Sequence, residues 1–228
     1  MDAIYTFITE QYILPFYLIV WLVSMACYRT YFDTPLKYYP MYLMYTLLTE
    51  LLGYFIKFHE EFQVLSDSRY DWYNVIIYNI YSVIAFMFFY YIYWQVLRNA
   101  KHKKWIVIGA GISLLSYIIS LFFQDPFYSN LYYADLLASM VLLFNIWLYY
   151  KEKKIEFSPY PKRYNLMFWT SLGLAVFHIF FPFLIIIGYE APEIWMEYNL
   201  RDILWIFILF MYGTFMIGVL VHKRRAFR

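Results

Sequence analysis

The chain of 228 residues consists of long apolar runs separated by short polar connections. Each run has about 20 residues, the length of an α-helix that crosses a hydrocarbon core of about 30 Å. Seven runs can be distinguished, at about 11–29, 38–58, 72–97, 105–123, 130–150, 164–188 and 199–221. The runs lack the alternating pattern of barrel strands, and lipid offers the backbone no hydrogen-bonding partner, so every run should be helical. The sequence predicts an all-α integral membrane protein, a single bundle of seven transmembrane helices.

The composition excludes most classes of soluble protein. The chain is 64% hydrophobic and 15% charged, whereas a soluble domain has about 25% charged residues. The connections are too short for a soluble catalytic or nucleic-acid-binding domain, so we expect one transmembrane domain over residues 1–228 and no nucleic-acid partner. The first residues, Met1-Asp-Ala, lack the basic segment of a cleavable signal peptide. We therefore expect the first apolar run to be retained.

The distribution of basic residues predicts the orientation. Counted over alternate sides of the seven runs, 15 Lys and Arg residues lie on one side and 3 on the other. Because basic loops are retained in the cytoplasm, the N-terminus should be outside and the C-terminus inside. Most acidic residues lie near the opposite, outer side. That outer face should attract cations and repel anions.

The inner side contains a group of basic residues that we call the basic collar: Lys101, Lys103, Lys104, Lys151, Lys153, Lys154, Lys162, Arg163, Lys223, Arg224 and Arg225. We expect the collar to contact anionic lipid headgroups, at about 1 kcal/mol per residue near the surface. An acidic protein partner would compete for the same residues. The simpler alternative is that these charges only orient the chain and make no specific contact.

Ionisable side chains within the apolar runs are candidates for a binding site, because charge in hydrocarbon is costly. At a rise of 1.5 Å per residue, Glu50 lies roughly 18 Å and His178 roughly 21 Å from the inner side, at or just outside the midplane. Six polar residues fall in the outer half: Glu50, Asn79, Asp135, His178, Arg201 and Asp202. The sequence predicts a polar pocket there that binds a small molecule or cation from the outer side.

Each of these residues also has a structural interpretation. His178 can be neutral, hydrogen-bonded to a Tyr or Asn, and serve helix packing. Pro182 follows it by four residues and removes the helical donor of the His178 carbonyl, so the helix should kink. Glu50 needs a partner or a proton inside the membrane. Arg201 and Asp202 can form an ion pair at the membrane interface.

Several motifs of enzymes and cofactor proteins do not occur. The chain has no H-E-x-x-H sequence, and its four histidines fall on different segments. A multi-histidine metal site is therefore not expected. The run 200–221 contains no lysine for a retinal Schiff base. We expect no catalytic residue, no metal, no cofactor and no enzymatic activity.

Three short segments support a family resemblance: Pro40-Met-Tyr-Leu-Met-Tyr-Thr-Leu-Leu-Thr-Glu50, Tyr78-Asn79 and Phe89-Tyr90. With its seven spans, the chain resembles the short heptahelical membrane modules of bacteria that stand alone or precede sensor kinases. The resemblance implies a receptor-like or accessory role in a bacterial cytoplasmic membrane. The chain ends seven residues after Val221. The resemblance therefore implies that the output passes to a separate protein partner.

Three function classes follow. The first is a receptor-like or accessory subunit that senses a ligand through its outer half and acts on a partner through the basic inner side. The second is a small transporter with a proton- or cation-linked carboxylate at Glu50, which an internal repeat between 38–97 and 164–221 would favour. The third is a structural subunit of a membrane complex. The outward position of the polar residues favours the first class.

Overall fold

The computed structural model describes residues 13–58, 60–62, 74–155, 161 and 164–222. All regular structure in these residues is helical, which confirms the predicted all-α class. The helices are α2 (Ile13–Ala26), α3 (Tyr39–Phe58), α4 (Val75–Val96), α5 (Ala100–Ser120), α6 (Tyr132–Ile155), α7 (Leu166–Glu190), α8 (Pro192–Glu197) and α9 (Leu200–Val221). Short 3₁₀ turns lie at Tyr28–Thr30, Pro35–Tyr38 and Glu60–Phe62.

Five helices, α4, α5, α6, α7 and α9, are long and apolar enough to cross a membrane. This finding indicates an integral membrane protein. Helix α2 is apolar but has 14 residues, and α3 has 20 residues but includes Glu50, Lys57 and several tyrosines and threonines, which lower its hydropathy. Helices α5 and α6 extend past the predicted spans 105–123 and 130–150, because their basic residues continue the helix. Asn99 begins α5 by accepting a hydrogen bond from the Lys101 backbone N–H at 2.9 Å.

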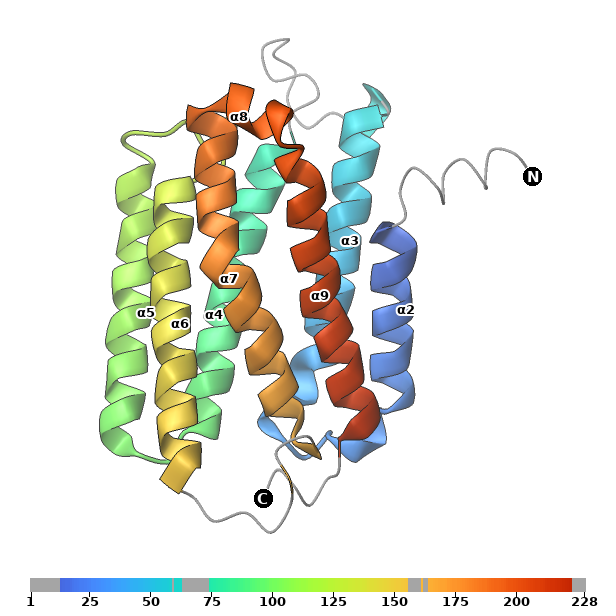
Figure 1. Ribbon diagram of the computed structural model, residues 1–228, viewed down its shortest axis with the longest axis vertical. Helices are drawn as coiled ribbons and strands as arrows, with labels where there is room; N and C mark the ends of the chain where they lie inside the picture. The colour runs from blue at the N-terminus through green and yellow to red at the C-terminus, as the bar shows by residue number, and fades with distance from the viewer. Residues whose placement is uncertain (1–12, 59, 63–73, 156–160, 162–163, 223–228) are drawn as a thin grey trace, which may run out of the picture.

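The long helices run along the longest axis of the molecule and alternate in direction (Figure 1). Helix α2 packs against α3 and α9, α7 against α6 and α9, and α4 against α3 and α6. These contacts close a ring of α2, α3, α4, α6, α7 and α9. Helix α5 lies outside this helix ring, against α4 and α6. Its Trp105, Val107 and Leu115 side chains are more than half exposed, as lipid-facing residues would be.

Helices α7 and α9 approach closely because glycines lie at their contact. A Cβ atom added to Gly173 would collide with Thr214 Oγ1 and lie 2.9 Å from the Met211 carbonyl oxygen. Pro182 is part of α7, and the helix changes direction part-way along its length (Figure 1). This bend agrees with the kink that the sequence predicts.

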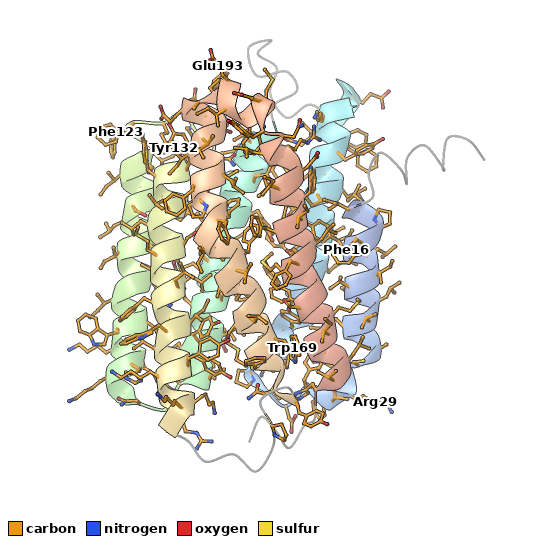
Figure 2. All side chains as sticks on the ribbon, viewed as in Figure 1. Phe16, Arg29, Phe123, Tyr132, Trp169 and Glu193 are labelled. Carbon is orange, nitrogen blue, oxygen red and sulfur yellow. The ribbon has the colours of Figure 1, made fainter. Side chains whose placement is uncertain are left out.

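Acidic residues predominate at one end of the helices and basic residues at the other, although Lys57 and Arg201 lie at the first end and Glu152 at the second. The acidic end contains Asp125, Glu190, Glu193, Glu197 and Asp202. The basic end contains Arg29, Lys37, Arg98, Lys101, Lys103, Lys104, Lys151, Lys153 and Lys154. Figure 2 shows Glu193 at one end of the molecule and Arg29 at the other. The other collar residues, Lys162, Arg163, Lys223, Arg224 and Arg225, lie outside the described residues.

Candidate functional site

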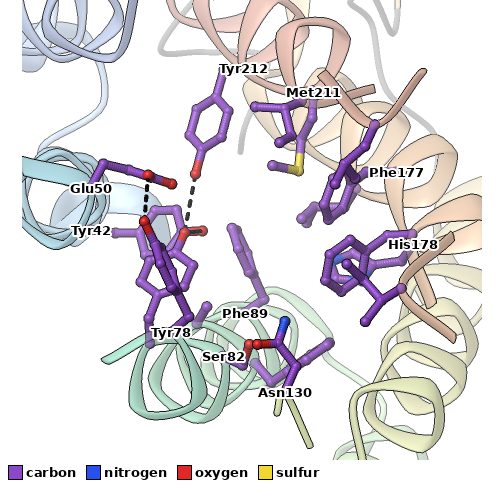
Figure 3. A pocket seen from close by; sticks show the side chains of 18 of the residues that line it. Tyr42, Glu50, Tyr78, Ser82, Phe89, Asn130, Phe177, His178, Met211 and Tyr212 are labelled. Atoms are coloured by element: carbon purple, nitrogen blue, oxygen red, sulfur yellow. Dashed lines mark hydrogen bonds between the residues drawn. The ribbon is translucent and has the colours of Figure 1, made fainter. Parts of the chain in front are cut away.

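A cavity of about 230 Å³ lies inside the helix ring (Figure 3). Its lining comes from α2, α3, α4, α7, α9 and the α5–α6 connection, and it extends from Asn130, near the acidic end, to Tyr42 in the first turn of α3. Nine lining residues are aromatic: Tyr17, Tyr42, Tyr78, Tyr81, Phe86, Phe89, Phe177, Phe181 and Tyr212. Within the described part of the chain, no Lys or Arg lines the cavity.

The helical repeat explains why these residues meet. In α3, Tyr42, Thr46 and Glu50 are four residues apart, so they lie on one face of the helix. The same spacing places Leu174, His178 and neighbouring residues of α7 on its cavity face. The cavity is therefore built from one face of each surrounding helix.

Glu50 lies at the wall of the cavity, where its carboxylate accepts a hydrogen bond from the Tyr78 hydroxyl at 3.0 Å. Gly53 makes this contact possible, because a Cβ atom there would lie 2.6 Å from the Tyr78 hydroxyl oxygen. The Asn74 side-chain amide also donates to the Gly53 carbonyl oxygen, at 2.9 Å. The contact between α3 and α4 thus fixes Tyr78 beside Glu50. A carboxyl group buried at this position needs either a compensating positive charge or a proton.

A cluster of hydroxyl groups lies beside Glu50. The Tyr81 hydroxyl is 2.9 Å from the Tyr42 hydroxyl, 3.0 Å from Thr46 Oγ1 and 3.2 Å from the Tyr212 hydroxyl. Tyr17 packs edge-on against Tyr212, with ring centroids 4.7 Å apart. We call the four tyrosines and the threonine bonded to them the tyrosine cluster: Tyr17, Tyr42, Thr46, Tyr81 and Tyr212. It joins α2, α3, α4 and α9 at the inner wall of the ring.

His178 lies across the cavity from Glu50 (Figure 3). Its Nδ1 atom is 3.0 Å from Ser139 Oγ of α6. The hydrogen-bond partner is therefore a serine rather than the Tyr or Asn expected from the sequence. The imidazole packs against Phe86 and Phe177, each with ring centroids 5.1 Å away. His178 thus gives the cavity a polar group within an aromatic wall.

The other four residues that the sequence predicts for the site do not line the cavity: Asn79, Asp135, Arg201 and Asp202. Asn79 is buried; its side-chain amide donates to the carbonyl oxygens of Pro126 and Ser129 at 2.8 and 3.1 Å and accepts from the Leu131 N–H at 3.0 Å. These bonds shape the α5–α6 connection, so Asn79 positions the segment that carries the cavity residue Asn130.

Asp135 is buried in α6 and accepts a hydrogen bond from the Tyr117 hydroxyl of α5 at 2.5 Å. Arg201 and Asp202 are exposed at the acidic end. The Arg201 guanidinium lies 5.9 Å from the centre of the Trp205 ring. The structure therefore brings Glu50 and His178 to one cavity and places Asn79, Asp135, Arg201 and Asp202 outside its lining.

Sequence reasoning did not include the tyrosine cluster, Gly53 or Ser139 in the site. The four-residue spacing of Tyr42, Thr46 and Glu50 is the signal that would have identified part of the cluster. Tyrosines are so frequent in this chain, 28 in all, that their number alone indicates no site.

The basic end has its own set of contacts. Glu152 of α6 accepts hydrogen bonds from the backbone N–H groups of Arg98 and Asn99 at 2.6 and 3.4 Å and contacts His102 Nδ1 at 2.9 Å. Two collar lysines lie over tryptophan rings, Lys103 over Trp94 at 4.8 Å and Lys151 over Trp147 at 4.9 Å. Tryptophans beside lysines are typical of residues at the headgroup level.

Comparison of this chain with known proteins does not assign the cavity to a known type of site. The described residues contain no group of three or more His, Cys, Asp or Glu side chains that could hold a metal ion. The resemblance to bacterial heptahelical modules stays a prediction. No protein-family model, curated protein or solved structure matches this chain.

Proposed function

We propose that this chain is a receptor-like membrane subunit that binds a small molecule in the cavity and acts on a partner protein through its basic end. The observation that carries the proposal is that α3, α4, α7 and α9 all line the cavity and also continue to the basic end. A ligand between these helices would favour one arrangement of the ring over another. The resulting helix movement would reach the surface available to a cytoplasmic partner.

The proposal includes the full topology. Helices α2 and α3 cross the membrane with the five longer helices, the N-terminus is outside, and the membrane is a bacterial cytoplasmic one. The separation of acidic and basic ends supports this orientation. The test is cysteine labelling in a Cys27→Ser background, which removes the one native cysteine. An impermeant maleimide should label Glu193→Cys in intact cells and Lys104→Cys only after permeabilisation; the reverse pattern would refute the orientation.

The basic collar would contact anionic headgroups and the partner. Lys103 and Lys151 lie over tryptophan rings, which supports a position at the headgroup level. Replacing Lys151, Lys153 and Lys154 by glutamine should weaken binding to anionic lipid or to the partner. If orientation, lipid binding and partner binding all stay unchanged, the collar has no specific contact.

The test of the receptor-like role is isolation of the tagged full-length chain in mild detergent. A partner in stoichiometric amount is expected. Ala85→Phe would occupy part of the cavity, and it should change the cross-linking pattern of that partner. The matched control is Ala26→Phe, which places the same side chain at an exposed position near the basic end.

Three results would contradict this role. A partner that is unaffected by Ala85→Phe would indicate a structural subunit. Absence of any partner would exclude the receptor-like role. Uptake of a solute by liposomes containing the purified chain would favour the transporter alternative, which the Glu50 carboxylate in the cavity supports.

A further inference from the structure

We propose that the cavity binds a small organic amine, with its ammonium group between the Glu50 carboxylate and the rings of the tyrosine cluster. This inference rests on the proposed function and specifies its ligand. Three features of the site support it: the buried carboxyl group of Glu50, the aromatic wall and the acidic end of the molecule.

The first feature is that Glu50 has a hydrogen-bond donor, whereas no cation lies beside it among the described residues that line the cavity. Tyr78 supplies one hydrogen bond to its carboxylate, and the described lining residues include no Lys or Arg. A buried carboxylate without a positive partner is unfavourable, and a ligand that brings an ammonium group removes this cost. An anionic ligand would increase it. The carboxylate therefore selects cations over anions.

The second feature is the aromatic wall around Glu50. Tyr42 and Tyr81 are nearly parallel, with ring planes 24° apart, and their hydroxyls bond to each other. The hydroxyl groups of the tyrosine cluster are thus engaged largely with one another. One face of the Tyr42 ring is stacked on Phe88, with centroids 4.8 Å apart, and Tyr81 is stacked on Tyr45 at 5.6 Å. The ring faces and edges that remain open to the cavity carry the cation-attracting potential of an aromatic wall. Aromatic rings beside a carboxylate are a suitable environment for an ammonium group.

The third feature is the charge of the end of the molecule next to the cavity. Asn130 lines the cavity and lies in the α5–α6 connection, beside the acidic end. Glu190, Glu193 and Asp202 are exposed at this end, together with the basic residues Lys57 and Arg201. An excess of acidic residues raises the local concentration of cations. The acidic end and the Glu50 carboxylate therefore favour the same charge.

The volume limits the size of the ligand. A cavity of about 150 Å³ lined by apolar side chains holds benzene, which has six non-hydrogen atoms. By proportion, 230 Å³ accommodates a ligand of about nine such atoms. The side of the cavity opposite Glu50 contains Leu174, Phe177 and Phe181, with His178 among them. The ligand would therefore place an apolar or aromatic group there and its ammonium group near Glu50.

The experiment compares three probes of nearly equal size: 2-phenylethylamine, the neutral 2-phenylethanol and the anionic phenylacetate. The full-length protein is reconstituted in phosphatidylcholine nanodiscs, and binding is measured by isothermal titration calorimetry with empty nanodiscs as background. The amine should bind at least tenfold more tightly than the alcohol, because a charge-assisted hydrogen bond contributes about 1.5–3 kcal/mol. Phenylacetate should not bind saturably.

Two variants test the role of Glu50. Glu50→Gln keeps the shape and the acceptor for Tyr78 but removes the charge, so it should abolish the preference for the amine and leave the alcohol affinity within twofold. Asp33→Asn is the matched control, because it removes an exposed acid at the basic end that does not line the cavity. It should change the amine affinity less than twofold. If Glu50→Gln does not fold, the probe series on the wild type still tests the inference.

The outcomes separate the two proposals. Equal affinities for amine and alcohol, or a preference that persists in Glu50→Gln, would overturn the amine inference. Absence of binding by every probe would also overturn the amine inference. The proposed function is judged independently, by the partner isolation and the Ala85→Phe variant.

Discussion

Replacement of Gly173 by alanine tests the close contact between α7 and α9. The added Cβ would collide with Thr214 Oγ1 and lie 2.9 Å from the Met211 carbonyl oxygen. Thr214 Oγ1 itself donates to that carbonyl at 2.7 Å, so moving the hydroxyl away breaks a hydrogen bond. The carbonyl belongs to the backbone of α9 and moves only with the helix. We expect the two helices to separate at this point.

The destabilisation caused by Gly173→Ala is best measured by comparison with the same substitution at a glycine that has free space around it. Around Gly213, also in α9, no atom beyond its chain neighbours and the backbone of its own helix lies within 4 Å of an added Cβ. Both variants gain the helix preference of alanine over glycine, about 0.5–1 kcal/mol, so this gain cancels in the comparison. The difference that remains is the cost of overpacking, about 1–3 kcal/mol. Gly173→Ala should therefore be less stable than Gly213→Ala by that amount.

The assay is unfolding of the full-length protein from mild detergent by titration with sodium dodecyl sulfate, followed by tryptophan fluorescence. Leu174 of α7 and Met211 of α9 line the cavity next to this contact. Gly173→Ala should therefore also weaken binding of a cavity ligand. If the two alanine variants have equal free energies of unfolding, the α7–α9 contact is not as close as the structure shows.

Three further predictions concern residues outside the cavity lining. Asn79→Ala removes the side chain that holds the α5–α6 connection and should lower the free energy of unfolding by about 2–4 kcal/mol in the same titration. Glu152→Ala leaves two backbone N–H groups near the start of α5 without their carboxylate and should cost about 1–2 kcal/mol, whereas the exposed Lys154→Ala should have little effect. Burial lowers the pKa of His222 at the end of α9, so folding favours its neutral form. Neutral His222 therefore contributes to the free energy of unfolding above the unfolded pKa of about 6.5, and this contribution is lost as the pH falls below that value. Between pH 7 and pH 5, the melting temperature in detergent should fall more for the wild type than for His222→Gln. Equal decreases would contradict this prediction.

Sequence reasoning located most helices and two residues of the site. Continuous apolar runs are a strong signal, and α4, α7 and α9 begin and end within a few residues of the predicted spans. Glu50 and His178 were found because an ionisable residue is rare within such a run. Both line the cavity.

The remaining features depend on contacts between distant segments. The basic residues after Asn99 resemble a loop in sequence, yet they form the first turn of α5. Asn79 and Glu50 are both polar residues in apolar runs, but Asn79 bonds to the α5–α6 connection and Glu50 lies at the cavity. The rotation of each helix about its axis decides between these outcomes. Packing with neighbouring helices determines that rotation, and a single sequence does not report it.

The contacts that join the helices also form the wall of the cavity, and there is a physical reason for this. Within a bilayer, apolar side chains gain little by leaving lipid for the protein interior, so helices associate through close packing and interhelical hydrogen bonds. Gly173 provides such packing between α7 and α9, and the Tyr81 hydroxyl bonds to residues of α3 and α9. These bonds hold the ring together around a centre that side chains do not fill. A ligand in that centre would act directly on the contacts between helices, as a receptor requires in order to convert binding into helix movement.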